Sequence, residues 1–158
     1  MRRWAVLTAL TALTALTART STALTAQTAP TAADSAGIRQ AALDYIEGYY
    51  DGDAARMERA VHPELAKRIV RTNEQGHSQL GQMSAMTLVQ GTRAGGGKDT
   101  PMADRHKDVT ILDIYQNAAS AKIYASGWVD YLHLAKWNGR WVIVNVLWEL
   151  HAAPRRSP

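Results

Sequence analysis

The clearest pattern of hydrophobic and polar positions lies in residues 108–150, on either side of the dipeptide Asn138-Gly139. Asn-Gly between two apolar runs favours a two-residue type I′ turn, because both central residues of that turn need a positive φ. The pattern therefore predicts a β-hairpin. Upstream, residues 109–115 and 121–125 predict another strand pair, so we expect a three-stranded antiparallel meander with two long strands.

The two-residue loop also predicts which side chains share a face of the hairpin, since side chains alternate with period two. One face is nearly all apolar and is expected to carry Tyr131, His133, Val144, Val146 and Trp148. The opposite face is expected to carry Trp128, Leu132, Leu134, Trp141 and Ile143, with Asp130 and Glu149 at a rim or subunit interface. A sheet so apolar on both faces needs cover on one side and a partner on the other, which predicts a homodimer through this second, convex face.

Three helices are predicted ahead of the meander. Apolar residues recur at helical spacing over 37–50, with Asp34 or Ser35 as the cap. A second helix of about eight residues follows Asp53 and ends at His62-Pro63, and a third spans 84–93. Between them we expect a short strand or extended arm over 65–71 and a polar turn over 73–81.

Residues 91–107 form a Gly-rich, charged connection that we interpret as a mobile loop or a functional lid. The order of helix, helix, short strand, helix and long antiparallel strands predicts an α+β fold. In such a fold, the three N-terminal helices cover the concave face of a curved antiparallel sheet.

The first 33 residues have the layout of a secretory signal peptide followed by a flexible Thr/Ala/Pro linker. A basic start, Met1-Arg2-Arg3, precedes an apolar run over 5–18 and small-residue cleavage sites. The run is too short and too rich in Thr for a membrane span, which needs about 20 apolar residues. The alternative is a low-complexity tail. We therefore expect an exported, periplasmic or secreted domain over 34–154 and a disordered tail over 155–158, without membrane association after removal of the leader.

Composition narrows the functional classes. The chain has 158 residues and no Cys, which excludes disulfides, thiolate zinc sites and a cysteine nucleophile. Its formal charge of +4 falls to 15 basic against 14 acidic residues once Arg2, Arg3 and Arg19 leave with the leader. A body so close to neutral argues against a nucleic-acid surface. The five histidines form no i, i+4 pair and have no carboxylate at ligand spacing, so no metal site and no cofactor are predicted.

The chain resembles the NTF2-like superfamily and, within it, the putative lumazine-binding group, with the SnoaL-type proteins and ketosteroid isomerase as more distant relatives. The resemblance covers about residues 38–150 and is carried by three motifs: the stretch Tyr45-Ile46-Glu47-Gly48-Tyr49-Tyr50-Asp51-Gly52-Asp53, the tripeptide Val61-His62-Pro63, and residues 130–145 with Lys136-Trp137-Asn138-Gly139-Arg140-Trp141. It implies a cone in which helices close one side of the sheet and leave a pocket at the open end. The scaffold hosts isomerases, cyclases, dehydratases and binding modules, so it does not by itself imply a reaction.

Ketosteroid isomerase uses an Asp general base, with a Tyr and a protonated Asp as hydrogen-bond donors. By resemblance, its first-helix Tyr falls on Tyr45 and its general base on Ile69, which cannot accept a proton. Its protonated Asp falls near Tyr131 or His133. Steroid isomerisation is therefore not expected, and a pocket with donors but without that base remains.

The alignment implies that the predicted pocket is lined by Tyr45, Tyr49, Tyr131, His133, Val144, Val146 and Trp148, a set that suits a flat apolar or aromatic ligand. Three hypotheses follow. The preferred one is an exported domain that binds such a small molecule without established catalysis. The second is a lyase or isomerase with His133 or His62 as the base and Tyr45 or Tyr131 as the donor. The third is a dimeric interaction module whose cavity is filled.

Overall fold

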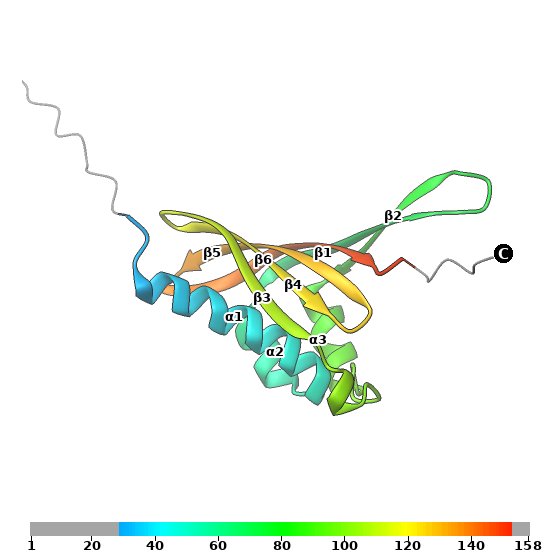
Figure 1. The fold of residues 1–158 in the computed structure, drawn as a ribbon, viewed down its shortest axis with the longest axis horizontal. Helices are drawn as coiled ribbons and strands as arrows, with labels where there is room; N and C mark the ends of the chain where they lie inside the picture. The colour runs from blue at the N-terminus through cyan, green and yellow to red at the C-terminus, as the bar shows by residue number, and fades with distance from the viewer. Residues whose placement is uncertain (1–28, 153–158) are drawn as a thin grey trace, which may run out of the picture.

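The computed structural model describes residues 29–152, which form a curved sheet covered on one side by helices (Figure 1). The helices are α1 (Ala32–Asp51), α2 (Ala54–Ala60) and α3 (Ala85–Arg93), with a short 3₁₀ turn at Met102–Asp104. The strands are β1 (Val61–Thr72), β2 (Ser78–Ser84), β3 (Lys107–Tyr115), β4 (Ala118–Ala125), β5 (Trp128–Trp137) and β6 (Arg140–Leu150). The predicted leader lies outside the described residues, apart from its last few positions.

The six strands form one sheet in the order β2-β1-β6-β5-β4-β3. All neighbours are antiparallel except β1 and β6, which pair in parallel. The predicted α+β class with helices over a curved sheet is confirmed. The meander has four strands where three were predicted, because residues 107–115 and 118–125 each form a full strand.

Helix α1 begins five residues before the predicted start. Thr31 is its N-cap, and its side chain accepts from the backbone N–H of Asp34 while the Asp34 carboxylate accepts from the backbone N–H of Thr31. This reciprocal capping box satisfies two of the free amides of the first turn. The helix ends at Gly52, whose φ of 63° is left-handed, and Asp53 then caps α2.

The connection predicted as an arm and a polar turn is a long hairpin. Strand β1 has 12 residues, and β2 pairs with its second half from Ala66 to Thr72. In Figure 1 this hairpin extends beyond the body of the molecule. His62 and Pro63 therefore lie in β1 and do not end a helix, because α2 stops at Ala60.

The Asn138-Gly139 turn has the predicted positive φ at both residues, but the register of the hairpin changes partway along β6. Leu134 pairs with Ile143, whereas His133 pairs with Asn145, so Val144 is an extra residue in β6. Because of this β-bulge, every later residue of β6 lies on the opposite face from the one that a regular hairpin would give it: Val146 pairs with Leu132 and Trp148 with Asp130.

Because of the bulge, several side chains of the hairpin lie on another face of the sheet than the sequence predicts. Trp128, Leu132, Leu134, Trp141 and Ile143, predicted for an outer dimer face, belong to the core or pack against it on the helix-covered side. Tyr131 and His133 lie on the opposite, convex side and are exposed. Val146 and Trp148 do face the helices, because the bulge has moved them there.

Candidate functional site

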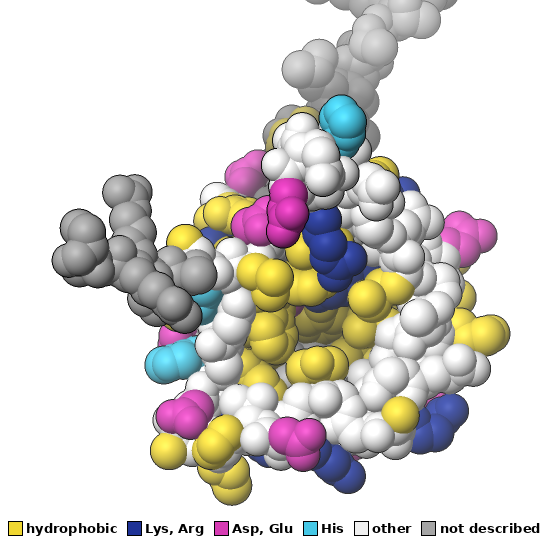
Figure 2. All heavy atoms as spheres, turned by 90° about the vertical axis from the view of Figure 1, so that its right-hand side faces the viewer, with side chains coloured by type: hydrophobic (Ala, Val, Ile, Leu, Met, Phe, Trp, Pro, Cys, Tyr) yellow, Lys and Arg dark blue, Asp and Glu magenta, His cyan; other side chains and the backbone are white. Residues whose placement is uncertain are grey.

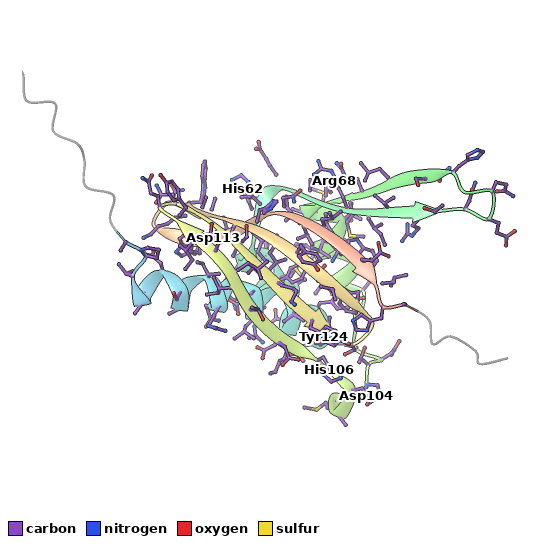
Figure 3. All side chains as sticks on the ribbon, turned by 45° about the horizontal axis from the view of Figure 1, so that its top comes forward. His62, Arg68, Asp104, His106, Asp113 and Tyr124 are labelled. Atoms are coloured by element: carbon purple, nitrogen blue, oxygen red, sulfur yellow. The ribbon has the colours of Figure 1, made fainter. Side chains whose placement is uncertain are left out.

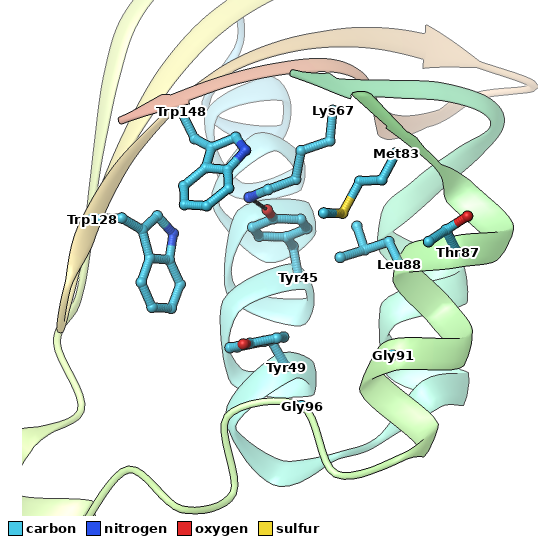
Figure 4. A pocket seen from close by; sticks show the side chains of 10 residues that line it. All are labelled: Tyr45, Tyr49, Lys67, Met83, Thr87, Leu88, Gly91, Gly96, Trp128 and Trp148. Carbon is cyan, nitrogen blue, oxygen red and sulfur yellow. Dashed lines mark hydrogen bonds between the residues drawn. The ribbon is translucent and has the colours of Figure 1, made fainter. Parts of the chain in front are cut away.

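A cavity of about 350 Å³ opens between the concave face of the sheet, α1 and α3 (Figure 4). Figure 2 shows it as a hollow lined mainly by hydrophobic side chains, with basic side chains reaching in from one edge. Helices, sheet and a loop all contribute to its lining: Tyr45, Tyr49, Lys67, Met83, Thr87, Leu88, Gly91, Gly96, Trp128 and Trp148.

The secondary structure explains why these side chains converge. Tyr45 and Tyr49 are four residues apart on α1 and so point from the same face of the helix. Lys67 and Met83 are direct partners in the β1–β2 register and share the concave face. Leu88 comes from α3 on the other side of the opening.

The loop after α3 closes the cavity beside Tyr49. The backbone N–H of Gly97 donates to the Tyr49 carbonyl over 2.9 Å. A Cβ on Gly96 would lie 2.5 Å from that carbonyl oxygen, and a Cβ on Gly97 would lie 2.7 Å from the Tyr49 ring. Glycine lets the loop approach α1 this closely, and Arg105 holds it further through a 2.9 Å ion pair with Asp51. The segment predicted as a mobile loop or lid thus packs on the end of α1.

A buried ion pair lies at the inner end of the cavity. Lys67 Nζ is 2.6 Å from Asp130 Oδ1, and the two side chains are 7% and 0% exposed. Lys67 Nζ also donates to the Tyr45 hydroxyl over 2.5 Å, and Trp128 Nε1 donates to Asp130 Oδ2 over 2.7 Å. Each Asp130 oxygen therefore accepts a hydrogen bond, as a buried carboxylate requires.

Aromatic rings surround the ammonium. Lys67 Nζ lies 4.9 Å from the centre of the Trp148 ring, which is a cation–π distance, whereas it meets Tyr45 at the hydroxyl end of the ring. Trp128 packs edge-on against Tyr49 with ring centres 5.6 Å apart. The positive charge is thus compensated by Asp130 and by the face of the Trp148 ring within a mainly apolar enclosure.

Burial shifts the pKa values of Lys67 and of the two tyrosines beside it, Tyr45 and Tyr49. It lowers the pKa of Lys67 below its ordinary value, although Asp130 acts in the opposite direction. Burial, followed by the negative charge of Asp130, raises the pKa of Tyr45 well above 10.0. Tyr45 is therefore a neutral phenol at neutral pH, and burial also raises the pKa of Tyr49.

The structure brings together some of the predicted site residues and separates others. Tyr45, Tyr49 and Trp148 line the cavity. Val146 is fully buried in the core, and Val144 forms the bulge. Tyr131 is 48% exposed on the convex face, so its predicted place in the pocket is wrong.

The two histidines considered as bases lie elsewhere. His133 is exposed on the convex face, with its Nδ1 3.2 Å from the Asn145 amide nitrogen. His62 lies near the start of β1 (Figure 3), where it packs edge-on against Trp137. Neither residue lines the cavity.

Sequence reasoning missed Lys67 and placed Asp130 on the wrong face. A signal was present, because Lys67 alternates with Leu65 and Ile69 on one face of a strand. A lysine at such a position is buried with its strand, and a buried lysine needs an acidic partner. Asp130, which alternates with Trp128 and Leu132, carries the complementary signal.

Over residues 29–152, we find no group of three or more His, Asp or Glu side chains arranged to hold a metal ion. In the same part of the chain, no helix combines the length and apolar character needed to cross a membrane.

The open α+β cone with a lined cavity is the architecture of NTF2-like proteins. Residues 33–149 match the model of the family described as "putative lumazine-binding", and the chain belongs to that family. A search of curated proteins finds no match.

Solved structures with the same fold include three NTF2-like proteins of unknown function. One from Shewanella baltica is 20% identical with a TM-score of 0.60, and the match covers 80% of this chain and 100% of that one. One from Methylobacillus flagellatus is 21% identical with a TM-score of 0.60, over 78% and 96%. One from Silicibacter pomeroyi is 16% identical with a TM-score of 0.60, over 78% and 100%. These similarities confirm the NTF2-like fold.

Proposed function

We propose that this domain binds a small planar aromatic molecule, uncharged at its inner end, in the cavity between α1, α3 and the sheet. The observation that carries the proposal is an aromatic enclosure around a charge-balanced pair, Lys67 and Asp130. The description of the family as putative lumazine-binding supports the same class of ligand.

The lining favours a flat ring system. Tyr49, Trp128 and Trp148 offer ring faces and edges, while Met83 and Leu88 offer adaptable apolar contact. A cavity of about 350 Å³ is in the range of small-ligand sites. Stacking and burial of apolar surface would then supply most of the affinity.

The ion pair favours a neutral hydrogen-bond acceptor on that ring. An ammonium has three donors, and among the described residues Lys67 Nζ bonds to two acceptors, Asp130 and Tyr45. A ring carbonyl can accept the third. A carboxylate at the same place would lie close to Asp130 and be repelled by it.

Catalysis is not part of the proposal. The hypothesised lyase or isomerase needs a histidine base at the ligand, and neither His133 nor His62 lines the cavity. The hypothesis of a filled cavity is also less well supported, because space remains beside Tyr49 and Trp148.

The test combines native mass spectrometry of the protein purified from its own host with a melting screen of flavin-like and steroid-like aromatic compounds. A ligand at 100 times its Kd stabilises by about 2.7 kcal/mol, which gives a clear thermal shift. We expect Trp148→Ala to abolish the shift and Tyr131→Ala, on the convex face, to retain it. No co-purifying mass and no shift across the panel would overturn the proposal.

We further propose that the domain is exported and forms a homodimer through the convex face. There Tyr124, Tyr131 and Leu147 are 44–49% exposed on neighbouring strands β4, β5 and β6. Burial of this apolar area would favour a second copy. Light scattering should give a dimer at tens of micromolar that Leu147→Asp dissociates. For export, the mature N-terminus should follow one of the small-residue sites in residues 21–26, ahead of the Thr31 cap of α1. A monomer at that concentration, or an intact residue 1, contradicts the respective proposal.

A further inference from the structure

A second cavity, of about 140 Å³, adjoins the first on the side of the β1–β2 hairpin. The two share Lys67, Met83 and Trp148, so they form one continuous depression. The outer part is lined in addition by hairpin residues, which are Ile69, Arg71, Gly81 and Gln82. The site therefore extends from the buried ion pair toward the protruding hairpin.

Arg71 lies on the same face of β1 as Lys67. The β1–β2 register is uninterrupted from Ala66 to Thr72, so residues 67, 69 and 71 all face the concave side. Gly81 on β2 makes room for the guanidinium, since a Cβ there would lie 3.3 Å from Arg71 Nη1. Figure 2 shows basic side chains entering the hollow from the hairpin edge.

The charge of Arg71 is uncompensated within the described residues. None of the ion pairs or hydrogen bonds found between residues 29 and 152 involves its side chain. Arg68, on the opposite face of the same strand, instead bonds to Gln82 and Asn145. The inner cavity is thus neutral overall, while its outer end carries a positive charge that faces the depression.

We infer that the ligand carries a terminal anionic group, a phosphate or a carboxylate, which binds Arg71 while the ring occupies the inner cavity. This inference rests on the proposed function and adds to it which end of the ligand carries a charge. The planar fork of arginine suits either anion, because both accept two parallel N–H bonds. Asp130 excludes the anion from the inner end, so the ligand enters ring first.

The geometry also limits the length of the ligand. Four residues along a strand span about 13 Å between Cα atoms, and the Arg71 guanidinium lies beside Gly81, the register partner of Ile69. The anion at Arg71 therefore lies on the hairpin side of the ring at Lys67, which favours a spacer between them. The expected ligand class is therefore a planar ring, a short flexible chain and a terminal anion.

Riboflavin and flavin mononucleotide are a suitable pair of probes, since they share the ring and the chain and differ by one phosphate. A flavin with a carboxylate at the end of its chain distinguishes the two anions. Binding to the full domain is measured by quenching of flavin fluorescence at low and at 0.5 M salt. Arg71→Gln is compared with Arg68→Gln, a matched loss of charge on the convex face.

We expect the wild type to bind flavin mononucleotide at least tenfold more tightly than riboflavin at low salt, with the difference shrinking at high salt. Arg71→Gln should remove this preference and leave riboflavin binding unchanged, whereas Arg68→Gln should retain it. A gain from one anion alone identifies the anion that the site selects, and equal gains show that Arg71 accepts either one. If riboflavin binds and neither anion adds affinity, the inference is overturned and the proposed function stands. If no aromatic probe binds, both fail.

Discussion

Lys67 Nζ and Asp130 Oδ1 lie 2.6 Å apart although their strands, β1 and β5, are not neighbours in the sheet. Strand β6 runs between them, and Trp148 on β6 is the register partner of Asp130. The ion pair therefore passes over the concave face of β6, beside the Trp148 ring. It links two parts of the sheet that are joined by backbone hydrogen bonds only through β6.

Replacing Lys67 by methionine should destabilise the domain by about 3–5 kcal/mol, because Asp130 would remain buried without its counter-charge. The free energy of unfolding in urea measures the effect. Lys122→Met, a similar change on the convex face, should alter stability by less than about 0.5 kcal/mol. The double variant Lys67→Met with Asp130→Leu should recover most of the loss. A single variant as stable as the wild type would contradict the prediction.

Replacing Tyr45 by phenylalanine should cost about 1.5–3 kcal/mol, since its hydroxyl accepts a hydrogen bond from the charged Lys67. The same urea titration, repeated in the Lys67→Met background, tests the mechanism. There the hydroxyl has lost its donor, so the substitution should cost much less. Additive losses would show that the two groups act independently.

Alanine substitutions at two glycines near the end of α3, Gly91 and Gly96, should change the stability of the domain in opposite directions. Gly96 has a φ of 52°, and a Cβ there would lie 2.5 Å from the Tyr49 carbonyl oxygen, so Gly96→Ala should cost about 2 kcal/mol or more. Gly91 lies within α3 with nothing within 4 Å of a Cβ, so Gly91→Ala should stabilise by up to about 1 kcal/mol. Thermal unfolding distinguishes the two, and equal effects would show that the loop does not press on α1.

The free energy of unfolding should fall in acid, partly because Asp34 becomes protonated and loses its hydrogen bonds as a carboxylate. Its hydrogen bonds, first to Lys136 and then to Thr31 and Trp141, hold its pKa well below the ordinary 3.8. The unfolded chain therefore binds more protons than the folded one near and below pH 3.8, so this contribution is present at neutral pH and is lost as the pH falls. Asp34→Asn should flatten the pH dependence of the urea midpoint between pH 5 and 2.5. Parallel profiles for variant and wild type would contradict this assignment.

The helices and the hairpin turn were predictable because their signals are local. The Asn138-Gly139 turn and the third helix follow from short motifs, and both agree with the structure. The start of α1 was missed because Thr31 and Asp34 form a capping box within a stretch whose Thr/Ala/Pro composition indicates a linker. The composition of the segment favoured a linker, but the capping box and the contacts of Asp34 with Lys136 and Trp141 make it helical from Ala32.

The candidate site could be predicted only in part. Tyr45 and Tyr49 follow from helical spacing, whereas the sheet side of the cavity depends on one extra residue, Val144. A bulge has no strong sequence signal, and the residues of β6 that follow it lie on the opposite face from the one that regular alternation predicts. For this reason Trp148 was placed correctly while Tyr131 was not. The partnership of Lys67 with Asp130 is a contact between distant segments, which a single sequence does not specify.

The anchoring of the first helical turn has a consequence for how the protein is made. Asp34 accepts hydrogen bonds from Lys136 and from Trp141, 102 and 107 residues further along the chain. In addition, β1 pairs in the sheet with β6, the last strand. A ribosome must therefore release the final hairpin before the first helix acquires its packing partners. Until then the early helices and β1 leave the tunnel with their apolar faces uncovered, so the nascent chain depends on chaperones or on rapid completion to avoid aggregation.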